Sequence, residues 1–249
     1  MKLDPVLLNM ACSWSMKAYK KNVEDAIKIE TKWSSTTAYI AKRKTIDVIA
    51  FRGTEQKLDW FTDALVIPVP YAGRMCHGGF TLAHKSIWKK VLEHVDFEKR
   101  TLITGHSLGG ALAELSAAKL WKKHNNLNII TFGKPNTFFK GFKKPMTTLD
   151  NQISCVQGSD LVARIPRLCY GPSKSQTMLY FANTGVDFVN PDKLTRDEDR
   201  RISDALSDHF MEGYKKRLSL FLEEQDKKPN KKISEELLET KSKKRKRNV

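Results

Sequence analysis

Blocks of apolar and polar residues along the chain predict strands and helices in turn. Short apolar, β-branched runs predict strands at Thr36–Ala41, Ile46–Phe51, Thr101–Thr104, Asn128–Phe132, Gln152–Val156 and Met178–Asn183. Apolar residues at helical spacing predict helices over residues 5–29, within 77–95, over 108–121 and over 204–222. Because the strands and helices alternate, the pattern predicts an α/β sheet.

The chain divides into a body and a tail. Its 249 residues, of which 40% are apolar, suffice for one sizeable core, so residues 1–222 are predicted to form one globular domain. Residues 223–249 are dominated by Lys, Glu, Asp, Asn and Ser. Such a segment buries too little apolar surface to offset the entropy of ordering, so we expect a basic, disordered tail.

Positive charge extends beyond the tail. The formal net charge is +16, and the tail carries only +4 of it, so +12 belongs to the body. A basic body favours anionic partners such as a membrane surface, nucleic acid or an acidic substrate. We expect no direct nucleic-acid function, because no recognition motif accompanies the charge. The cluster Lys243–Arg247 is open to three interpretations: a nuclear import signal, a membrane-surface anchor or a solvated tail.

The chain carries few signs of export. Its four cysteines form no C-x-x-C pair and no zinc-like spacing, which favours free thiols in a reducing compartment. Asp4 and Pro5 interrupt the N-terminus before an apolar secretory segment can form, and no run approaches the ~18 apolar residues of a membrane span. We therefore expect a cytoplasmic protein, with nuclear import through Lys243–Arg247 as an alternative.

One short motif suggests chemistry: Gly105-His106-Ser107-Leu108-Gly109. It follows an apolar strand and opens an Ala-rich helix, which is the context of a nucleophile elbow. The sharp turn exposes the serine oxygen, and glycines two residues away on each side allow the close approach. The helix N-terminus directs N–H groups at the site. The alternative is a glycine-rich turn with a solvated serine.

A serine hydroxyl needs a base, and His209 is the best candidate. In α/β hydrolases the acid and the histidine follow the serine in the chain, and only His124 and His209 follow Ser107. His124 lies at the far end of the predicted elbow helix, ~25 Å away at ~1.5 Å per residue. His209 therefore remains, against the alternative of a surface histidine.

The acid that orients the histidine is predicted to be Asp160. Catalytic acids in such sheets lie just beyond the carboxyl end of a strand, and Asp160 follows the predicted strand Gln152–Val156. Asp187 also follows a predicted strand and is the reserve candidate. Asp208 adjoins His209 in sequence, so its side chain is expected to face elsewhere.

An oxyanion needs two N–H donors. One is predicted to be the backbone of Leu108, directly after the nucleophile. The second is predicted at Thr54, because Gly53 and Thr54 leave the strand Ile46–Phe51 with a free backbone and a hydroxyl. The alternative is an ordinary turn at the end of a strand.

Taken together, the motifs identify a family resemblance. The chain resembles the class 3 lipases, the fungal triacylglycerol lipase-like branch of the α/β hydrolases. The resemblance spans about residues 36–214. The matching blocks, in family order, are Phe51-Arg52-Gly53-Thr54, Asp59-Trp60 with Asp63, His77-Gly78-Gly79-Phe80, the segment Gly105–Ala111, Thr131-Phe132-Gly133-Lys134-Pro135, Asp160-Leu161-Val162 with Pro166, and Asp208-His209.

The resemblance implies an α/β-hydrolase fold with a mostly parallel central sheet flanked by helices. It also implies a triad of Ser107, Asp160 and His209 and oxyanion donors at Thr54 and Leu108. A lid is implied over roughly residues 55–70. Lid residues expected to face the acyl chain or, alternatively, to pack in the core include Trp60, Phe61 and Leu65.

The predicted function is hydrolysis of carboxylic ester bonds in acylglycerol-type lipids, with no metal or organic cofactor. The expected partners are a lipid ester substrate and an anionic membrane surface, and we expect a monomer. Ala163 departs from the family pattern, which more often has proline after the valine, and Arg164 adds positive charge near the predicted site, which would suit an anionic lipid. The alternatives are therefore a phospholipase A1 acting on anionic phospholipids and a non-catalytic lipase-like binding or signalling module.

Overall fold

The computed structural model describes residues 3–32, 34–54, 67–124, 126–140, 151–158, 160–166, 170–171, 176–185, 187–191, 196 and 209–225. The predicted lid residues Trp60, Phe61 and Leu65 lie outside the described residues, as does the tail beyond residue 225.

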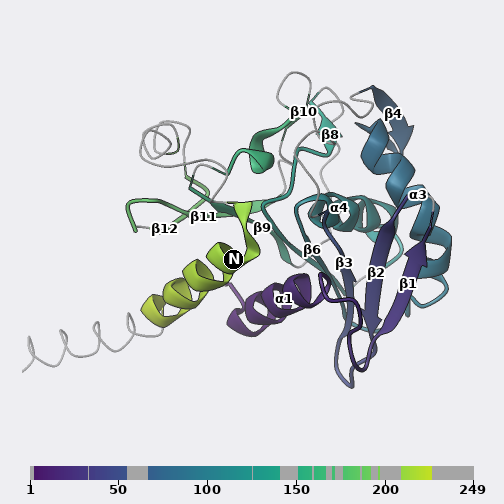
Figure 1. The fold of residues 1–249 in the computed structure, drawn as a ribbon, viewed down its shortest axis with the longest axis horizontal. Helices are drawn as coiled ribbons and strands as arrows, with labels where there is room; N and C mark the ends of the chain where they lie inside the picture. Colours follow the sequence, from purple (N-terminus) through teal and green to yellow (C-terminus); the bar gives the residue numbers. More distant parts are fainter. Residues whose placement is uncertain are drawn as a thin grey trace, which may run out of the picture.

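The framework is an eight-stranded sheet (Figure 1). In spatial order its strands are β1 (Ile27–Thr31), β2 (Thr36–Ala41), β3 (Asp47–Phe51), β6 (Thr101–His106), β7 (Leu127–Phe132), β9 (Asn151–Gln157), β11 (Thr177–Phe181) and β12 (Asp187–Val189). The five strands from β3 to β11 are parallel, and the outer strands pair antiparallel at both edges. Because parallel strands end at the same edge, the loops after β3, β6, β7 and β9 gather there.

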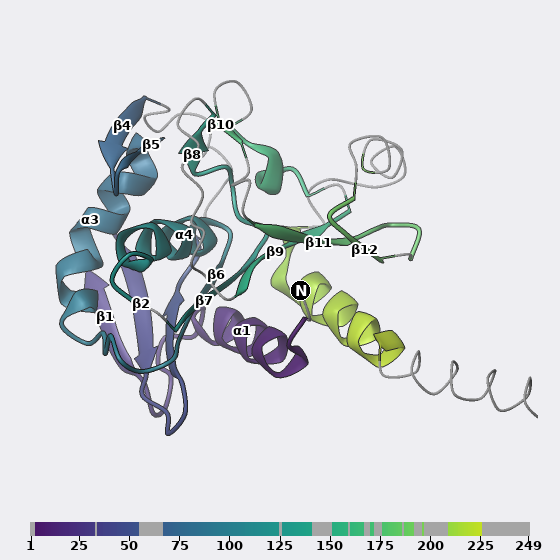
Figure 2. The same cartoon turned by 180° about the vertical axis from the view of Figure 1, so that it is seen from behind.

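Helices cover both faces of this sheet (Figures 1 and 2). Helix α1 (Pro5–Lys17) and the C-terminal helix (residues 211–225) pack on one face. Helices α3 (Gly78–Leu92) and α4 (Leu108–Leu120) pack on the other. Each face therefore has its own apolar core. Helix α1 begins where the Asp4 carboxylate accepts hydrogen bonds from the backbone N–H groups of Val6 and Leu7, directly before Pro5.

A second, smaller sheet adjoins α3. It has the order β10 (Tyr170–Gly171), β8 (Phe138–Phe139), β5 (Arg74–His77) and β4 (Pro68–Tyr71). The hydrophobic pattern does not predict this sheet, because its strands have two to four residues and show no alternation that a window could detect. The hairpin of β4 and β5 carries the chain directly into α3.

Most predicted elements are confirmed, with one clear error. The prediction of one helix over residues 5–29 is wrong after Lys17, because the chain turns and then forms the edge strand β1. The apolar residues at 23, 26 and 27 match a helical spacing, but β1 alternates exposed and buried side chains from Lys28 and pairs with β2. The C-terminal helix is described from residue 211; its predicted start at residues 204–208 lies outside the described residues. In the described part of the chain, no helix is both long and apolar enough to cross a membrane.

Candidate active site

Ser107 occupies a tight turn between β6 and α4. Its backbone has φ 55° and ψ −129°, a strained conformation for a residue other than glycine. The turn brings Gly105 against Gly109 so closely that a Cβ on Gly105 would lie 2.4 Å from the Gly109 carbonyl carbon. A Cβ on Gly109 would likewise lie 2.2 Å from the Phe51 carbonyl oxygen. The first contact requires glycine at position 105 and the second requires it at position 109, which accounts for the spacing in the motif.

The backbone of Ser107 is held by its neighbours while its hydroxyl stays available. Its N–H donates to the Phe132 carbonyl at 3.0 Å, and its carbonyl accepts from the N–H of Gly110 at 2.9 Å. Within the described part of the chain, the Ser107 hydroxyl has no hydrogen-bond partner. Hydrogen bonds between a serine and its base are often long before substrate binds, so this geometry is compatible with a nucleophile.

The structure brings Asp160 and His209 together across 49 residues of sequence. The Nδ1 atom of His209 lies 3.1 Å from Oδ1 and 3.0 Å from Oδ2 of Asp160. The carboxylate is fully buried, while 19% of the His209 side chain is exposed. An acid buried behind a partly exposed imidazole leaves the outer ring nitrogen free for proton transfer, which is the arrangement that an orienting acid requires.

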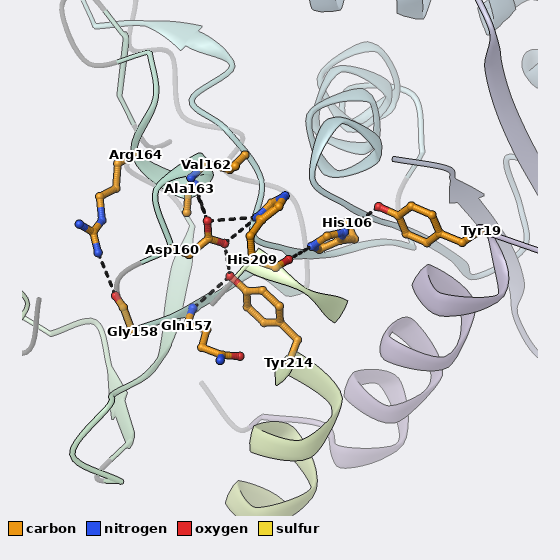
Figure 3. A network of polar contacts seen from close by, with 10 residues as sticks. All are labelled: Tyr19, His106, Gln157, Gly158, Asp160, Val162, Ala163, Arg164, His209 and Tyr214. Carbon is orange, nitrogen blue, oxygen red and sulfur yellow. Dashed lines mark hydrogen bonds and ion pairs between the residues drawn. The ribbon is translucent and has the colours of Figure 1, made fainter. Parts of the chain in front are cut away.

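Three further donors complete the surroundings of Asp160 (Figure 3). The hydroxyl of Tyr214 donates to Oδ2 at 2.6 Å, and the backbone N–H groups of Val162 and Ala163 donate to Oδ1 at 2.8 and 3.4 Å. Burial, and then the negative charge of Asp160, raise the pKa of Tyr214 well above its ordinary value, so the hydroxyl remains a donor. These contacts fix the carboxylate in position and satisfy a charge that would otherwise be costly to bury.

His106, next to Ser107 in the chain, contacts the backbone of His209. Its Nε2 atom lies 2.6 Å from the His209 carbonyl oxygen, and its Nδ1 atom lies 2.7 Å from the hydroxyl of Tyr19. A carbonyl only accepts, so Nε2 is the donor. Burial and the nearby His209 lower the pKa of His106 to about 3, so the ring is neutral and Nδ1 accepts from Tyr19.

Sequence reasoning missed Tyr19, His106 and Tyr214 as parts of this site. Figure 3 shows Tyr214 beside Asp160, and His106 between His209 and Tyr19. The three residues come from the C-terminal helix, from β6 and from the segment after α1. Tyr19 and His106 lie 87 residues apart. His106 was visible only as a variable position inside the serine motif, and no local pattern marks either tyrosine.

The loop after β3 lies beside the elbow. A Cβ on Gly53 would lie 2.1 Å from the Tyr19 hydroxyl and 2.7 Å from the His106 carbonyl oxygen, so this loop touches both residues. Thr54 follows directly. Leu108 is the first residue of α4, where backbone N–H groups have no partner within the helix. The two predicted oxyanion donors therefore belong to segments in contact at the elbow.

The alternative candidates for the acid and the base make other contacts. Asp187 forms an ion pair with Arg217, and His124 Nε2 lies 3.1 Å from the hydroxyl of Thr101, at the opposite end of β6 from Ser107. Arg164 directs its guanidinium onto the Gly158 carbonyl at 3.0 Å, away from Asp160 (Figure 3). Asp208 lies outside the described residues.

Cysteine and metal chemistry are set apart from this site. Cys12, Cys76 and Cys155 are buried free thiols, and Cys169 lies outside the described residues. Burial raises the pKa of Cys12 to about 11 and that of Cys76 to about 12, which makes both poor nucleophiles. Across the described ranges, no three His, Cys, Asp or Glu residues gather closely enough to hold a metal ion.

Part of the chain that includes the elbow is similar to a known protein family. Residues 48–169 match the model of the family described as Lipase (class 3). The chain is similar to the class 3 lipases over these residues, which make up just under half of its length. The family segment contains the elbow and Asp160 and ends before His209.

Two relatives of this chain are fungal lipases. A secreted mono- and diacylglycerol lipase of Fusarium solani is 31% identical over 154 residues, which cover 54% of this chain and 44% of that protein. A lipase of Rhizomucor miehei is 28% identical over 167 residues, which cover 58% of this chain and 46% of that protein. The chain thus spans less than half the length of these two curated relatives.

A solved structure extends the likeness to the fold. It is that of a triacylglycerol lipase whose catalytic centre is described as a serine protease triad. It superposes with a TM-score of 0.66 at 21% identity, and the match covers 81% of this chain and 91% of that one. The predicted α/β-hydrolase fold, with a mostly parallel central sheet flanked by helices, is confirmed.

Proposed function

We propose that this protein is a serine esterase that hydrolyses carboxylic ester bonds of acylglycerol-type lipids. Ser107 is the nucleophile, His209 the general base and Asp160 the acid that orients it. The backbone N–H of Leu108 and the backbone N–H and hydroxyl of Thr54 bind the oxyanion. The observation that carries the proposal is the contact between the buried Asp160 carboxylate and His209 beside a strained serine.

The mechanism is a two-step acyl transfer. His209 accepts the proton of Ser107 as the serine oxygen attacks the ester carbonyl, and the oxyanion forms beside Leu108 and Thr54. The intermediate collapses when His209 returns the proton to the leaving alcohol, which leaves an acyl group on Ser107. Water, deprotonated by His209, then attacks the acyl-enzyme, and its collapse regenerates the serine and releases the fatty acid.

Asp160 and His106 act through His209 in this scheme. The carboxylate keeps the proton of the neutral ring on Nδ1, so that Nε2 is the free base, and it stabilises the imidazolium that forms. The hydrogen bond from His106 to the His209 carbonyl anchors the backbone of the base to the residue beside the nucleophile. The relative positions of base and nucleophile are thereby supported by groups that never touch substrate.

The proposal is tested by covalent labelling of Ser107 and by turnover of a soluble ester. The wild-type protein is expected to react with a fluorophosphonate probe at Ser107 and to hydrolyse short nitrophenyl esters. A Ser107→Ala variant is expected to lose the label and to fall in kcat by ~10⁶. The matched control is Ser116→Ala, which removes a buried hydroxyl from the middle of the same helix. Nitrophenyl ester hydrolysis at the wild-type rate in Ser107→Ala would falsify the proposal.

Two other functions make different predictions. The basic body favours a phospholipase A1 acting on anionic phospholipids. A panel of mono-, di- and triacylglycerols against anionic phospholipids, at equal molar amounts, separates this function from acylglycerol hydrolysis. A non-catalytic lipase-like module is expected to leave Ser107 unlabelled by the probe in a protein that is otherwise folded.

A further inference from the structure

The C-terminal end of α4 exposes positive charge. Lys119, Lys122 and Lys123 face solvent, and within the described part of the chain none of them forms an ion pair. Glu114, the acid of the same helix, is fully buried, and its carboxylate lies 3.0 Å from Lys134 Nζ. The acidic residue of α4 is therefore turned away from the three lysines, and their charge is not compensated by it.

These lysines border a concave, aromatic surface. The end of α4, the second half of α3 and the turn between β4 and β5 enclose two adjoining hollows of about 410 and 520 Å³. Trp88, Phe97 and Trp121 form the apolar walls of the first. The residues that line the two hollows include four basic side chains and no acidic one. The surface therefore combines apolar area with one sign of charge.

Helix α3 continues this surface with a stripe of leucine and lysine. Leu82, Lys85, Lys89 and Leu92 follow one another at intervals of three or four residues, so they share one face of the helix. Leu82 and Leu92 are 47% and 38% exposed, and both lysines face solvent. A single exposed leucine is ordinary. Two leucines that flank a pair of lysines beside an aromatic hollow form an amphipathic patch.

The patch is rigid. The amino groups of Lys85 and Lys119 lie 5.4 and 4.7 Å from the centre of the Tyr71 ring. The Tyr71 hydroxyl bonds Nδ1 of the buried His84 at 2.8 Å, and Nε2 of His84 bonds the hydroxyl of Ser116 at 2.9 Å. One chain of contacts thus ties the β4–β5 hairpin, α3 and α4 together. Figure 1 shows these elements on one side of the molecule, away from α1 and the C-terminal helix.

We propose that this patch, formed by the α3 stripe and the hollows at the end of α4, docks on a membrane surface rich in anionic phospholipid. Lysines near such a surface are attracted to it electrostatically. Tryptophan and leucine suit the boundary between headgroups and acyl chains. The patch lies about 20 Å from Ser107 along the 13 residues of α4, so it is an attachment site separate from the elbow.

The occupant is a lipid surface because exposed apolar side chains lie next to the lysines. A nucleic acid would engage the same lysines, but exposed leucines contribute nothing to phosphate contacts. A bilayer uses both kinds of side chain at once. The proposal concerns attachment alone and does not depend on ester hydrolysis.

The experiment measures vesicle binding with the Ser107→Ala protein, so that no lipid is consumed. Vesicles of phosphatidylcholine are compared with vesicles that also contain phosphatidylserine, by co-sedimentation. The patch variant is Lys119→Gln, Lys122→Gln and Lys123→Gln combined. The matched control is Lys20→Gln, Lys21→Gln and Lys216→Gln combined, which removes the same charge from exposed lysines after α1 and on the C-terminal helix, on the opposite face of the sheet. Each set of lysine substitutions is also made in the protein that keeps Ser107. There, hydrolysis of a soluble nitrophenyl ester reports that the fold is intact.

The Ser107→Ala protein is expected to bind the anionic vesicles and to bind pure phosphatidylcholine much less. The patch variant is expected to bind the anionic vesicles roughly a hundredfold more weakly, because each lysine near the surface contributes roughly fivefold. Replacing Leu82 and Leu92 by serine is expected to weaken binding further, and the control is expected to bind nearly as the parent does. Equal losses in patch variant and control would overturn the proposal, as would unchanged binding in the patch variant. Tighter, patch-dependent binding to duplex DNA would overturn the lipid assignment.

Discussion

Charged side chains have opposite environments at the two ends of α4. Around its N-terminal end, the buried carboxylate of Asp160 receives hydrogen bonds from His209, Tyr214 and two backbone N–H groups. At its C-terminal end, three lysines face solvent with no ion pair in the described part of the chain. A charge that must sit at a defined position is buried among donors that hold it. A charge that only attracts a surface needs exposure and neighbours of the same sign.

The largest difference is expected from Asp160→Asn at the buried end. The amide cannot hold the ring in the tautomer that leaves Nε2 free, so turnover of a soluble ester is expected to fall ~10⁴-fold. The matched control is Asp187→Asn, since Asp187 is bound to Arg217 and does not touch the site. Comparable losses in the two variants would show that the position of Asp160 beside His209 is not what matters.

A smaller effect is expected from Tyr214→Phe. Removing a hydrogen bond to a charged group costs roughly 1.5–3 kcal/mol, so kcat is expected to fall on the order of tenfold to a hundredfold. Tyr180→Phe is the control, because its buried hydroxyl bonds the Gly158 carbonyl at 2.7 Å without touching Asp160. Both variants are expected to lose stability, and only Tyr214→Phe to lose turnover. Urea unfolding measures the loss of stability and steady-state kinetics measures the loss of turnover. Equal turnover in Tyr214→Phe and Tyr180→Phe would contradict the role of Tyr214.

Lowering the pH is expected to reduce the free energy of unfolding, because buried histidines resist protonation in the folded protein. Burial lowers the pKa of His77 to about 4 and those of His84 and His106 to about 3. Below pH 6.5 the unfolded chain binds protons that the folded chain excludes, so stability is lost as pH falls, by roughly 1.4 kcal/mol per unit for each histidine. Urea unfolding at pH 7 and pH 5 measures the loss.

The contribution of a single histidine to this loss of stability can be measured. His84→Gln is expected to make the loss between pH 7 and pH 5 smaller by about 2 kcal/mol, because one excluded proton is removed. His94→Gln, at a partly exposed position, serves as the control. An unchanged loss in His84→Gln would mean that another group dominates the acid response.

The smallest effect is expected at the exposed end of α4. Lys122→Glu combined with Lys123→Glu is expected to change the unfolding free energy by less than ~0.5 kcal/mol, since neither lysine has an acidic partner among the described residues. Turnover of a soluble ester is expected to stay at the wild-type level. A large loss of stability in urea would show that the lysines at this end are structural, and the contrast between the two ends would fail.

The sequence predicts the parts of the site that local patterns encode. The elbow is readable because the glycines, the strand and the helix lie within a short segment, and chain order then selects His209 and Asp160. The contacts of Tyr19 and Tyr214 are not readable, because they depend on how α1 and the C-terminal helix pack against the sheet. The edge strand β1 was misjudged for the same reason: its pairing with β2 decides its structure. The cytoplasmic location stays a prediction.

Tyr19 has a consequence for how the protein can be divided. Its hydroxyl reaches His106 from a segment that precedes the matched family region, which begins at residue 48. His209 and Tyr214 lie beyond the end of that region, at residue 169. A fragment cut to the matched boundaries would keep Ser107 and Asp160 but lack His209 and both tyrosines. The unit that must be inherited, expressed or transplanted together therefore extends from α1 to the C-terminal helix.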